Sequence, residues 1–279
     1  KSITKTTCIL PWIALDRNAD TSNPAFAPCC LYQSKEKTKR SFAEYWHSTE
    51  LEKIREQMNN GEKPDGCWKC FNDESSGQKS MRQSVNESRL GPHADLLDKS
   101  TKQLKPLQVK MLSGASCNLA CRMCQSHVSS KVHKVWDTIG LPLKEPYQYD
   151  QESENIIREN ADAVRYIDLM GGEPFYHKRI QRLIAWLVEN DHARHITVYV
   201  TTNAMILDDK LISHLKRFEN GFLEDCVNEI KYFKKWGDKC KKVALRMDGQ
   251  QNLMNVFASE NLQINLLEIG KKLDNGEKL

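Results

Sequence analysis

Ten cysteines, and the way they are grouped, constrain this 279-residue chain more than any other feature. A disulfide-stabilised secreted scaffold would be smaller and would spread its cysteines for bridging. Gaps of two and three residues instead let neighbouring thiolates reach one metal centre, so we expect a metal-binding protein. Such thiols must stay reduced, which predicts a cytoplasmic location. Only Cys226 and Cys240 stand apart; the clustered cysteines are Cys8, Cys29, Cys30, Cys67, Cys70, Cys117, Cys121 and Cys124.

The composition is that of a globular chain long enough to bury a core, at 39% hydrophobic and 28% charged. No apolar run approaches the roughly 18 residues of a membrane span, and the first residues lack a signal-peptide pattern. We therefore expect no membrane partner. The net charge of +4 is spread without long basic blocks. The lysines between residues 231 and 242 predict a solvated face, so no nucleic-acid partner is expected.

The chain divides into two parts near residue 105. Residues 1–105 predict an irregular, cysteine-bearing module followed by a polar connector. Glycines and a proline between residues 61 and 66 place Cys67 and Cys70 on a turn. Two helices are predicted in this part, at 41–59 and 81–88.

From residue 106 to residue 279 the pattern changes to alternating strands and helices, which is typical of parallel β/α units. Strands are predicted at 107–112, 163–170 and 196–200, and helices at 177–190 and 207–218. Ligands of such folds bind at the carboxyl ends of the strands. Each predicted strand runs into a candidate site segment, so we predict an α/β fold with a partial, TIM-like β/α barrel.

Cys117, Cys121 and Cys124 follow the first of these strands with the spacing C-x3-C-x2-C. Three thiolates can bind three irons of a 4Fe–4S cluster and leave the fourth iron open to chelate a small molecule. A cluster with four protein ligands can only pass electrons. The spacing favours iron–sulfur but leaves a zinc site open, with His127 as the fourth ligand.

The next strand ends in Gly171-Gly172-Glu173-Pro174, and together with the cysteine loop this resembles the radical S-adenosylmethionine (radical SAM) superfamily. The resemblance implies an enzyme in which the open iron of the cluster takes S-adenosyl-L-methionine. Reductive cleavage of that cofactor would give a 5′-deoxyadenosyl radical that abstracts hydrogen from a substrate. A reductant such as a flavodoxin or ferredoxin would supply the electron.

The same resemblance assigns roles by position but names no catalytic side chain. Cys117, Cys121 and Cys124 would be the cluster ligands. Gly171 to Pro174 would meet the cofactor's amino group, because glycines allow close backbone approach and a carboxylate matches an ammonium.

Two further residues are candidate cofactor contacts. Asn203 ends the third strand, where similar enzymes contact the cofactor, although a turn-forming asparagine is the alternative. A strand is also predicted at 243–247. The Asp248-Gly249 that follows it resembles the fourth-strand Asp–Gly segment of related enzymes, with a longer gap from Asn203 than we expect.

The N-terminal part contains Cys8-Ile9-Leu10-Pro11-Trp12, Pro28-Cys29-Cys30 and Gly66-Cys67-Trp68-Lys69-Cys70. These segments are similar to the auxiliary-cluster modules called SPASM or twitch domains, although here the module precedes the barrel. Five cysteines are too few for two auxiliary clusters. The resemblance implies one auxiliary 4Fe–4S cluster, and a structural zinc site with the same ligands is the alternative. The implied ligands are Cys8, Cys29 in preference to Cys30, Cys67 and Cys70.

Beyond about residue 218 the resemblance weakens, because a barrel of this kind normally has six strands. The sequence predicts mainly helices there, at 222–236, 253–257 and 264–273. The sequence leaves two alternatives open: a barrel truncated after about residue 218, or a missing stretch of the natural protein.

The leading functional hypothesis is a radical enzyme that modifies a peptide or protein side chain, by analogy with the auxiliary module. One alternative is a radical enzyme that acts on a nucleotide, sugar or small metabolite. Another, from a different class, is a non-catalytic binding protein stabilised by zinc.

Overall fold

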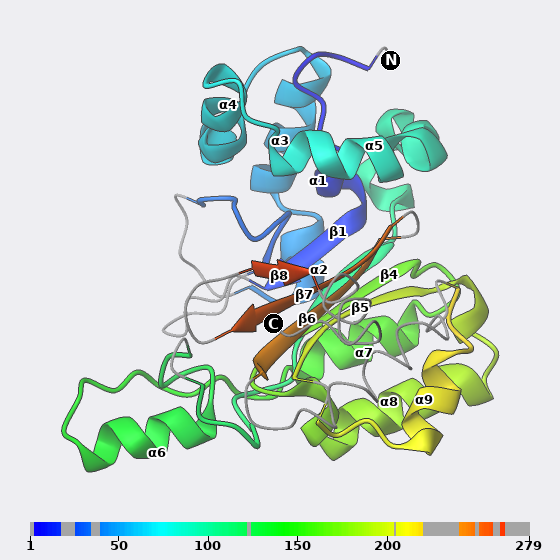
Figure 1. Ribbon diagram of the computed structural model, residues 1–279. Helices are drawn as coiled ribbons and strands as arrows, with labels where there is room; N and C mark the ends of the chain where they lie inside the picture. Colours follow the sequence, from blue (N-terminus) through cyan, green and yellow to red (C-terminus); the bar gives the residue numbers. More distant parts are fainter. Residues whose placement is uncertain are drawn as a thin grey trace. The chain divides into compact units, whose positions relative to one another are not determined.

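The computed structural model describes residues 3–17, 26–34, 40–121, 124–203, 205–219, 240–248, 251–258 and 263–265. The chain forms two compact units (Figure 1). The first unit contains Lys1–Lys110 and Ile156–Ala163, and the second contains Met111–Asn155 and Val164–Leu279. Strand β3 (Gln108–Leu112) and helix α7 (Gln151–Glu159) each contribute residues to both units. The sequence predicted a division near residue 105. It predicted neither α7 nor the inclusion of residues 156–163 in the first unit.

The first unit is mainly helical with a short piece of sheet. Strand β1 pairs antiparallel with β2, with Asp16 opposite Ala27, and parallel with the start of β3, with Ala14 opposite Gln108. All four residues of β1 are buried. The elements are α1 (Leu10–Ile13), β1 (Ala14–Arg17), β2 (Phe26–Ala27), α2 (Phe42–Trp46), α3 (Thr49–Asn59), α4 (Trp68–Ser75) and α5 (Met81–His93), with 3-10 turns at Asp65–Cys67, Ala94–Asp98 and Thr101–Gln103.

The single helix predicted at 41–59 is wrong, because it is two helices, α2 and α3. The Ser48 hydroxyl accepts a hydrogen bond from the backbone N–H of Leu51 at 3.2 Å, which starts a new helix. A serine at an N-cap satisfies an otherwise unpaired N–H and so favours a helix start at that point. The apolar spacing remains helical on either side of this break, and Leu51, Ile54 and Met58 form the buried face of α3.

The turn predicted to carry Cys67 and Cys70 is also wrong. Cys67 ends the short 3-10 helix and Cys70 lies in the first turn of α4. Gly66 leaves room for the ring of Tyr32, which a Cβ on this residue would overlap. The helix predicted at 81–88 is longer than expected, and α5 ends one residue after Pro92.

The second unit contains the parallel β/α arrangement that the sequence predicts. Strands β4 and β5 pair in parallel, with Tyr166 opposite Thr197 and Leu169 opposite Val200. Helix α8 connects them, and α8 and α9 lie side by side (Figure 1). This mixed α/β unit is compatible with a partial β/α radical SAM fold. Its elements are α6 (Ser130–Thr138), β4 (Tyr166–Met170), α8 (Lys178–Glu189), β5 (Thr197–Thr202), α9 (Asp209–Leu215), β6 (Cys240–Asp248), β7 (Gln251–Ala258) and β8 (Gln263–Asn265), with 3-10 turns at Pro174–Tyr176 and Ala193–His195.

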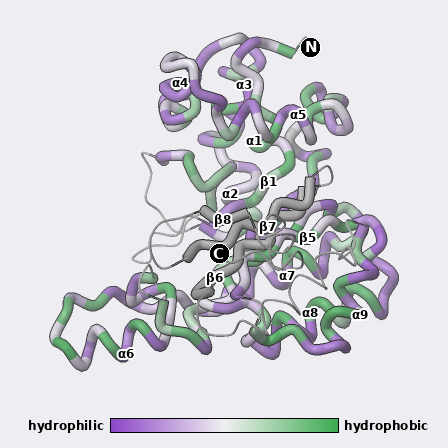
Figure 2. The backbone as a smooth tube through the Cα atoms, viewed as in Figure 1, coloured by the Kyte–Doolittle hydropathy of each residue, from purple (hydrophilic) through white to green (hydrophobic). Residues whose placement is uncertain are grey.

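Helices α8 and α9 each bury one apolar face. Figure 2 shows apolar and polar segments alternating along both helices, as expected for helices with one buried side. The imidazole of His177 caps α8 by accepting from the N–H of Arg179. The buried residues are Ile180, Leu183, Ile184 and Leu187 in α8, and Leu211, Ile212 and Leu215 in α9.

Strands β6, β7 and β8 differ from the structure predicted for this part of the sequence. Strand β6 includes the predicted strand 243–247 but runs antiparallel to β5, with Thr202 opposite Val243. The prediction of a helix at 253–257 is wrong, because those residues lie in β7. Of the range predicted as a helix at 264–273, residues 264 and 265 lie in β8, and the rest lie outside the described residues. Asp248 pairs with Gln251 across a two-residue connection that contains a glycine. Such a connection is typical of a β-hairpin, and this local signal outweighed the weak helical spacing. The helix predicted at 222–236 lies outside the described residues.

Helix α6 was not predicted from the sequence and follows the cysteine loop. Its N-cap is Ser129, and Val132 is its buried residue. In the part of the chain that the structure describes, no helix combines the length and apolar character needed to cross a membrane.

Candidate active site

Two backbone segments of the second unit are joined directly: residues 113–116, which lead into the cysteine loop, and residues 170–173, which end β4. Successive backbone hydrogen bonds join the two segments, so the residues that lead into the cysteine loop are attached to the Gly-Gly-Glu-Pro segment. The bonds run from Ser113 N to Met170 O at 2.7 Å, from Gly172 N to Gly114 O at 2.9 Å, and from Glu173 N to Ser116 O at 2.9 Å.

The two glycines of this segment are required by that close approach. Gly171 has a φ of 137°, a conformation that side chains rarely adopt, and a Cβ there would overlap the Ser113 hydroxyl. On Gly172 a Cβ would lie 2.5 Å from the carbonyl oxygen of Ser116. The sequence-based argument assigned the glycines to the cofactor; the structure shows that they also admit the backbone of the cysteine loop.

The carboxylate of Glu173 is buried, with 1% of the residue exposed, and accepts hydrogen bonds from residues in two elements. Its Oε1 accepts from the Thr202 hydroxyl at 2.6 Å, and its Oε2 accepts from the Asn203 N–H at 2.6 Å. The Phe175 N–H donates to Oε1 at 3.1 Å. A buried carboxylate needs such donors because it has lost its water. Glu173 therefore joins the end of β4 to the end of β5.

Asn203 extends this network to the cysteine loop. Its side-chain amide nitrogen donates to Asn118 Oδ1 at 2.8 Å, and its Oδ1 accepts from Met205 N at 3.0 Å. The prediction that Asn203 lies at the strand end beside the other site residues agrees with this placement. The amide contact with Met205 also matches the alternative, a turn-forming asparagine.

The three cysteines of the loop lie close to this network. Cys117 and Cys121 are buried and Cys124 is half-buried. The N–H of Cys117 donates to Ser130 Oγ at 3.2 Å, and its sulfur accepts from Leu119 N at 3.5 Å. Burial raises the pKa of the Cys117 thiol, and the nearby negative charge of Glu173 raises it further. A cation at the sulfurs would relieve both effects, which is the chemistry of a thiolate–metal site.

The structure does not bring Asp248 to this site. Strand β6 runs antiparallel to β5, so its last residue lies toward the beginning of β5, whereas Thr202 and Asn203 lie at or just beyond its end. The prediction assumed a parallel strand, and the reversed direction removes its basis. Asp248 is part of the β6–β7 hairpin instead.

Three residues of the site were not predicted from the sequence: Ser113, Asn118 and Thr202. The position of Thr202 at the end of a predicted strand was the only signal for it. Ser113 is buried and, among the residues that the structure describes, its hydroxyl has no hydrogen-bond partner. His127, the fourth ligand of the zinc alternative, is buried with its ring edge-on to Tyr147 at 5.0 Å.

The cysteines of the first unit form a second group. Cys8 lies within electrostatic range of Cys67, Cys70 and Cys29. Burial, reinforced by the neighbouring thiols, raises the pKa of Cys8 to about 12. Cys30 is exposed, and its sulfur contacts Met81 Sδ at 3.9 Å.

The donor chemistry of both groups fits iron–sulfur binding. The loop offers three thiols beside a glycine cradle, and the first unit offers four thiols, of which Cys8 and Cys70 are buried. Within the described ranges, no group of three or more His, Cys, Asp or Glu side chains is arranged to hold a single metal ion.

Residues 111–224 match the family model of the radical SAM superfamily. The matched range includes the cysteine loop, Gly171 to Pro174 and Asn203, which are the residues that the structure connects. No curated protein and no solved structure matches the chain. The chain thus contains a radical SAM domain, whose family uses a 4Fe–4S cluster, S-adenosyl-L-methionine and a reductant. The match supports an enzyme and says nothing of its substrate.

Proposed function

We propose that this radical SAM enzyme abstracts hydrogen from a peptide or protein side chain, with Cys117, Cys121 and Cys124 holding its catalytic cluster. One observation carries the assignment of the site: the register of hydrogen bonds that attaches residues 113–116 to residues 170–173. Held by these three cysteines, a 4Fe–4S cluster would supply the electron for reductive cleavage of S-adenosyl-L-methionine.

The residues of the chain then have separate tasks. The backbone at Gly171 and Gly172 lies directly against the residues that lead into the cysteine loop, since no side chain fits there. Glu173 supplies negative charge that matches the cofactor's ammonium group, and Thr202 and the Asn203 N–H hold that carboxylate in place. Pro174 begins a short 3-10 turn and adds no N–H that would compete for the carboxylate.

The first unit would hold a second 4Fe–4S cluster through Cys8, Cys29, Cys67 and Cys70, as in SPASM or twitch modules. The grouping of these four thiols and the divergence of Cys30 support this ligand set. The peptide or protein substrate rests on the analogy with that module. A zinc site with the same ligands is the alternative for this unit, although among the described residues these thiols are not arranged around a single metal ion.

Cofactor cleavage in the absence of substrate tests the proposal, because it needs no knowledge of the substrate. Anaerobically reconstituted protein should absorb broadly near about 400 nm and contain roughly eight irons per chain for two clusters. With a strong reductant it should form 5′-deoxyadenosine. Cys121→Ala should abolish that product and keep roughly four irons. Cys30→Ala, a matched control, should still form 5′-deoxyadenosine and keep roughly eight irons.

Two results would overturn the proposal. A colourless protein with stoichiometric zinc would identify a zinc-stabilised binding protein instead. Continued cofactor cleavage by the Cys121→Ala variant would show that the cluster ligands are misassigned. Once cleavage is established, incubation with peptides and with small metabolites separates the proposed substrate class from its alternative, because 5′-deoxyadenosine forms faster with a true substrate.

A further inference from the structure

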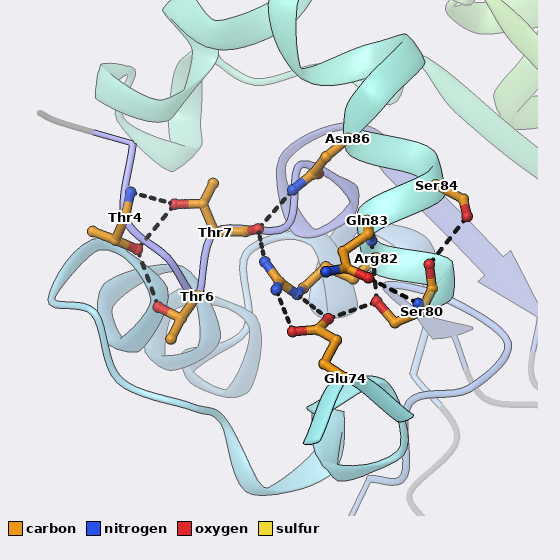
Figure 3. Close-up of polar contacts among 9 residues, drawn as sticks. All are labelled: Thr4, Thr6, Thr7, Glu74, Ser80, Arg82, Gln83, Ser84 and Asn86. Carbon is orange, nitrogen blue, oxygen red and sulfur yellow. Dashed lines mark hydrogen bonds and ion pairs between the residues drawn. The ribbon is translucent and has the colours of Figure 1, made fainter. Parts of the chain in front are cut away.

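In the first unit, the peptide groups on both sides of Cys8 are held by two side chains of helix α5. The carbonyl oxygen of Thr7 accepts from Arg82 Nη1 at 2.8 Å and from Asn86 Nδ2 at 2.7 Å. The N–H of Ile9 donates to Asn86 Oδ1 at 3.0 Å. Figure 3 shows Arg82 and Asn86 reaching from one helix to the same carbonyl. Since Cys8 lies between Thr7 and Ile9, these contacts set the position of its backbone.

Arg82 also holds the helix that carries Cys70. Its Nε donates to Glu74 Oε1 at 2.9 Å and its Nη2 donates to Glu74 Oε2 at 2.6 Å, a two-point contact (Figure 3). Glu74 lies one turn after Cys70 on α4. The guanidinium carbon also lies 5.1 Å from the centre of the Phe71 ring. One side chain therefore connects the Cys8 segment to the cysteine-bearing helix.

Glu74 is prepared for this contact. The Ser80 hydroxyl, at the N-cap of α5, donates to Glu74 Oε1 at 2.6 Å. Although burial opposes ionisation, the hydrogen bonds from Arg82 and Ser80 lower the pKa of Glu74, so it is a carboxylate at neutral pH. The pair is then a charged, bidentate contact that fixes the plane of the guanidinium.

The charge of Arg82 lies near the thiols as well. Arg82 is 8% exposed, and its positive charge acts on both Cys8 and Cys67. A buried ion pair is weak support for stability by itself, because removing two charges from water is costly. Four thiolates in a buried site, in contrast, need nearby positive charge. The arrangement thus suits a metal site better than simple helix packing.

We infer that Arg82 is a positioning residue for the four-thiol site, setting Cys8 against Cys67 and Cys70 and offsetting part of the negative charge of the loaded site. Asn86 contributes to the position of Cys8 but, because it is neutral, does not offset the negative charge of the site. The inference rests on the proposed second cluster. It goes beyond the ligand set, because it gives the guanidinium of Arg82 a role in cluster formation and in the reduction potential of the cluster.

The test uses the full chain with Cys117, Cys121 and Cys124 replaced by alanine, so that only the first unit can bind a cluster. Metal per chain is measured against a chelator, which reports iron and zinc alike. For an iron cluster, the midpoint potential is measured by a redox titration followed by electron paramagnetic resonance. Lys79→Met is the matched control, because Lys79 forms an exposed ion pair with Glu87.

Arg82→Met should reduce metal retention at least about fivefold, and the remaining cluster should be about tenfold harder to reduce, a fall of about 59 mV. Arg82→Lys keeps the charge but cannot make all three contacts, so it should lose metal while its potential stays near that of the parent. Asn86→Leu should behave as Arg82→Lys does. Lys79→Met should change neither quantity.

The results separate this inference from the proposal it rests on. A parent chain that binds neither iron nor zinc refutes the second metal site and this inference with it. A parent that binds metal, together with an Arg82→Met variant that retains it equally well at an unchanged potential, overturns the inference alone. If Arg82→Met does not fold, as judged by circular dichroism, Arg82→Lys still decides, because full metal retention in that variant contradicts the positioning role.

Discussion

The hydroxyl of Thr202 donates a 2.6 Å hydrogen bond to the buried carboxylate of Glu173, and so joins the ends of two parallel strands. The role of each residue in this site depends on the other. The carboxylate would be an uncompensated buried charge without its donors, and the threonine is an ordinary β-branched strand residue without its acceptor.

Thr202→Val should weaken the site while it preserves the shape of the side chain. Loss of a hydrogen bond to a buried charged group should destabilise the fold by about 1–3 kcal/mol, measured by urea unfolding. Cofactor cleavage should fall as well, because Glu173 is then less well held. Thr201→Val is the control, since Thr201 faces the other side of β5. Equal stability of the two variants would contradict the role of Thr202.

Gly171→Ala should lower the stability of the fold more than Gly91→Ala does. Gly171 has a φ of 137° and no room for a Cβ, so the substitution should cost about 1–3 kcal/mol or more and displace the cysteine loop. Gly91 lies in α5 with nothing within 4 Å of an added Cβ apart from its chain neighbours, but it precedes Pro92, which disfavours helical backbone for a residue with a Cβ, so alanine there should change stability by less than about 1 kcal/mol. Thermal unfolding of both variants measures the difference, and a neutral Gly171→Ala would disprove the close approach.

Metal-free protein should be alkylated at Cys30 well before Cys8. Burial raises the pKa of Cys8 to about 12, so at pH 8 its reactive thiolate is on the order of one part in ten thousand. Because the pKa is raised, labelling of Cys8 should increase with pH up to about 12, whereas exposed Cys30 should react readily at pH 8. Iodoacetamide labelling followed by peptide mass spectrometry measures both rates, and equal rates at pH 8 would count against the buried environment of Cys8.

Cys29→Ser and Cys30→Ser should differ in metal content although the residues are adjacent. Cys29 interacts electrostatically with Cys8, whereas the sulfur of Cys30 lies against Met81. The first variant should lose roughly four irons per chain and the second should lose none. Iron analysis after anaerobic reconstitution decides between them. Loss of iron in the Cys30 variant alone would reverse the assignment.

Much of the second unit could be predicted from residue patterns. The parallel pair β4–β5, helices α8 and α9, and the loop positions of the cysteines all agree with local spacing. Local patterns failed where a cap or a turn interrupted them. Ser48 divides a helix that apolar spacing alone would continue, and the two-residue connection after Asp248 turns the chain back into β7.

The spacing of Cys117, Cys121 and Cys124, and the Gly-Gly-Glu-Pro run after a strand, are properties of residue order, so the sequence by itself indicates the chemistry of the cluster loop. Strand direction is not encoded in this way, because alternation has the same period whether a strand runs parallel or antiparallel to its neighbour. Only the tertiary structure therefore removed Asp248 from the site and supplied Thr202 as the partner of Glu173. It also decided that Arg82 contacts the carbonyl of Thr7, 75 positions away along the chain, since such contacts depend on how distant segments pack.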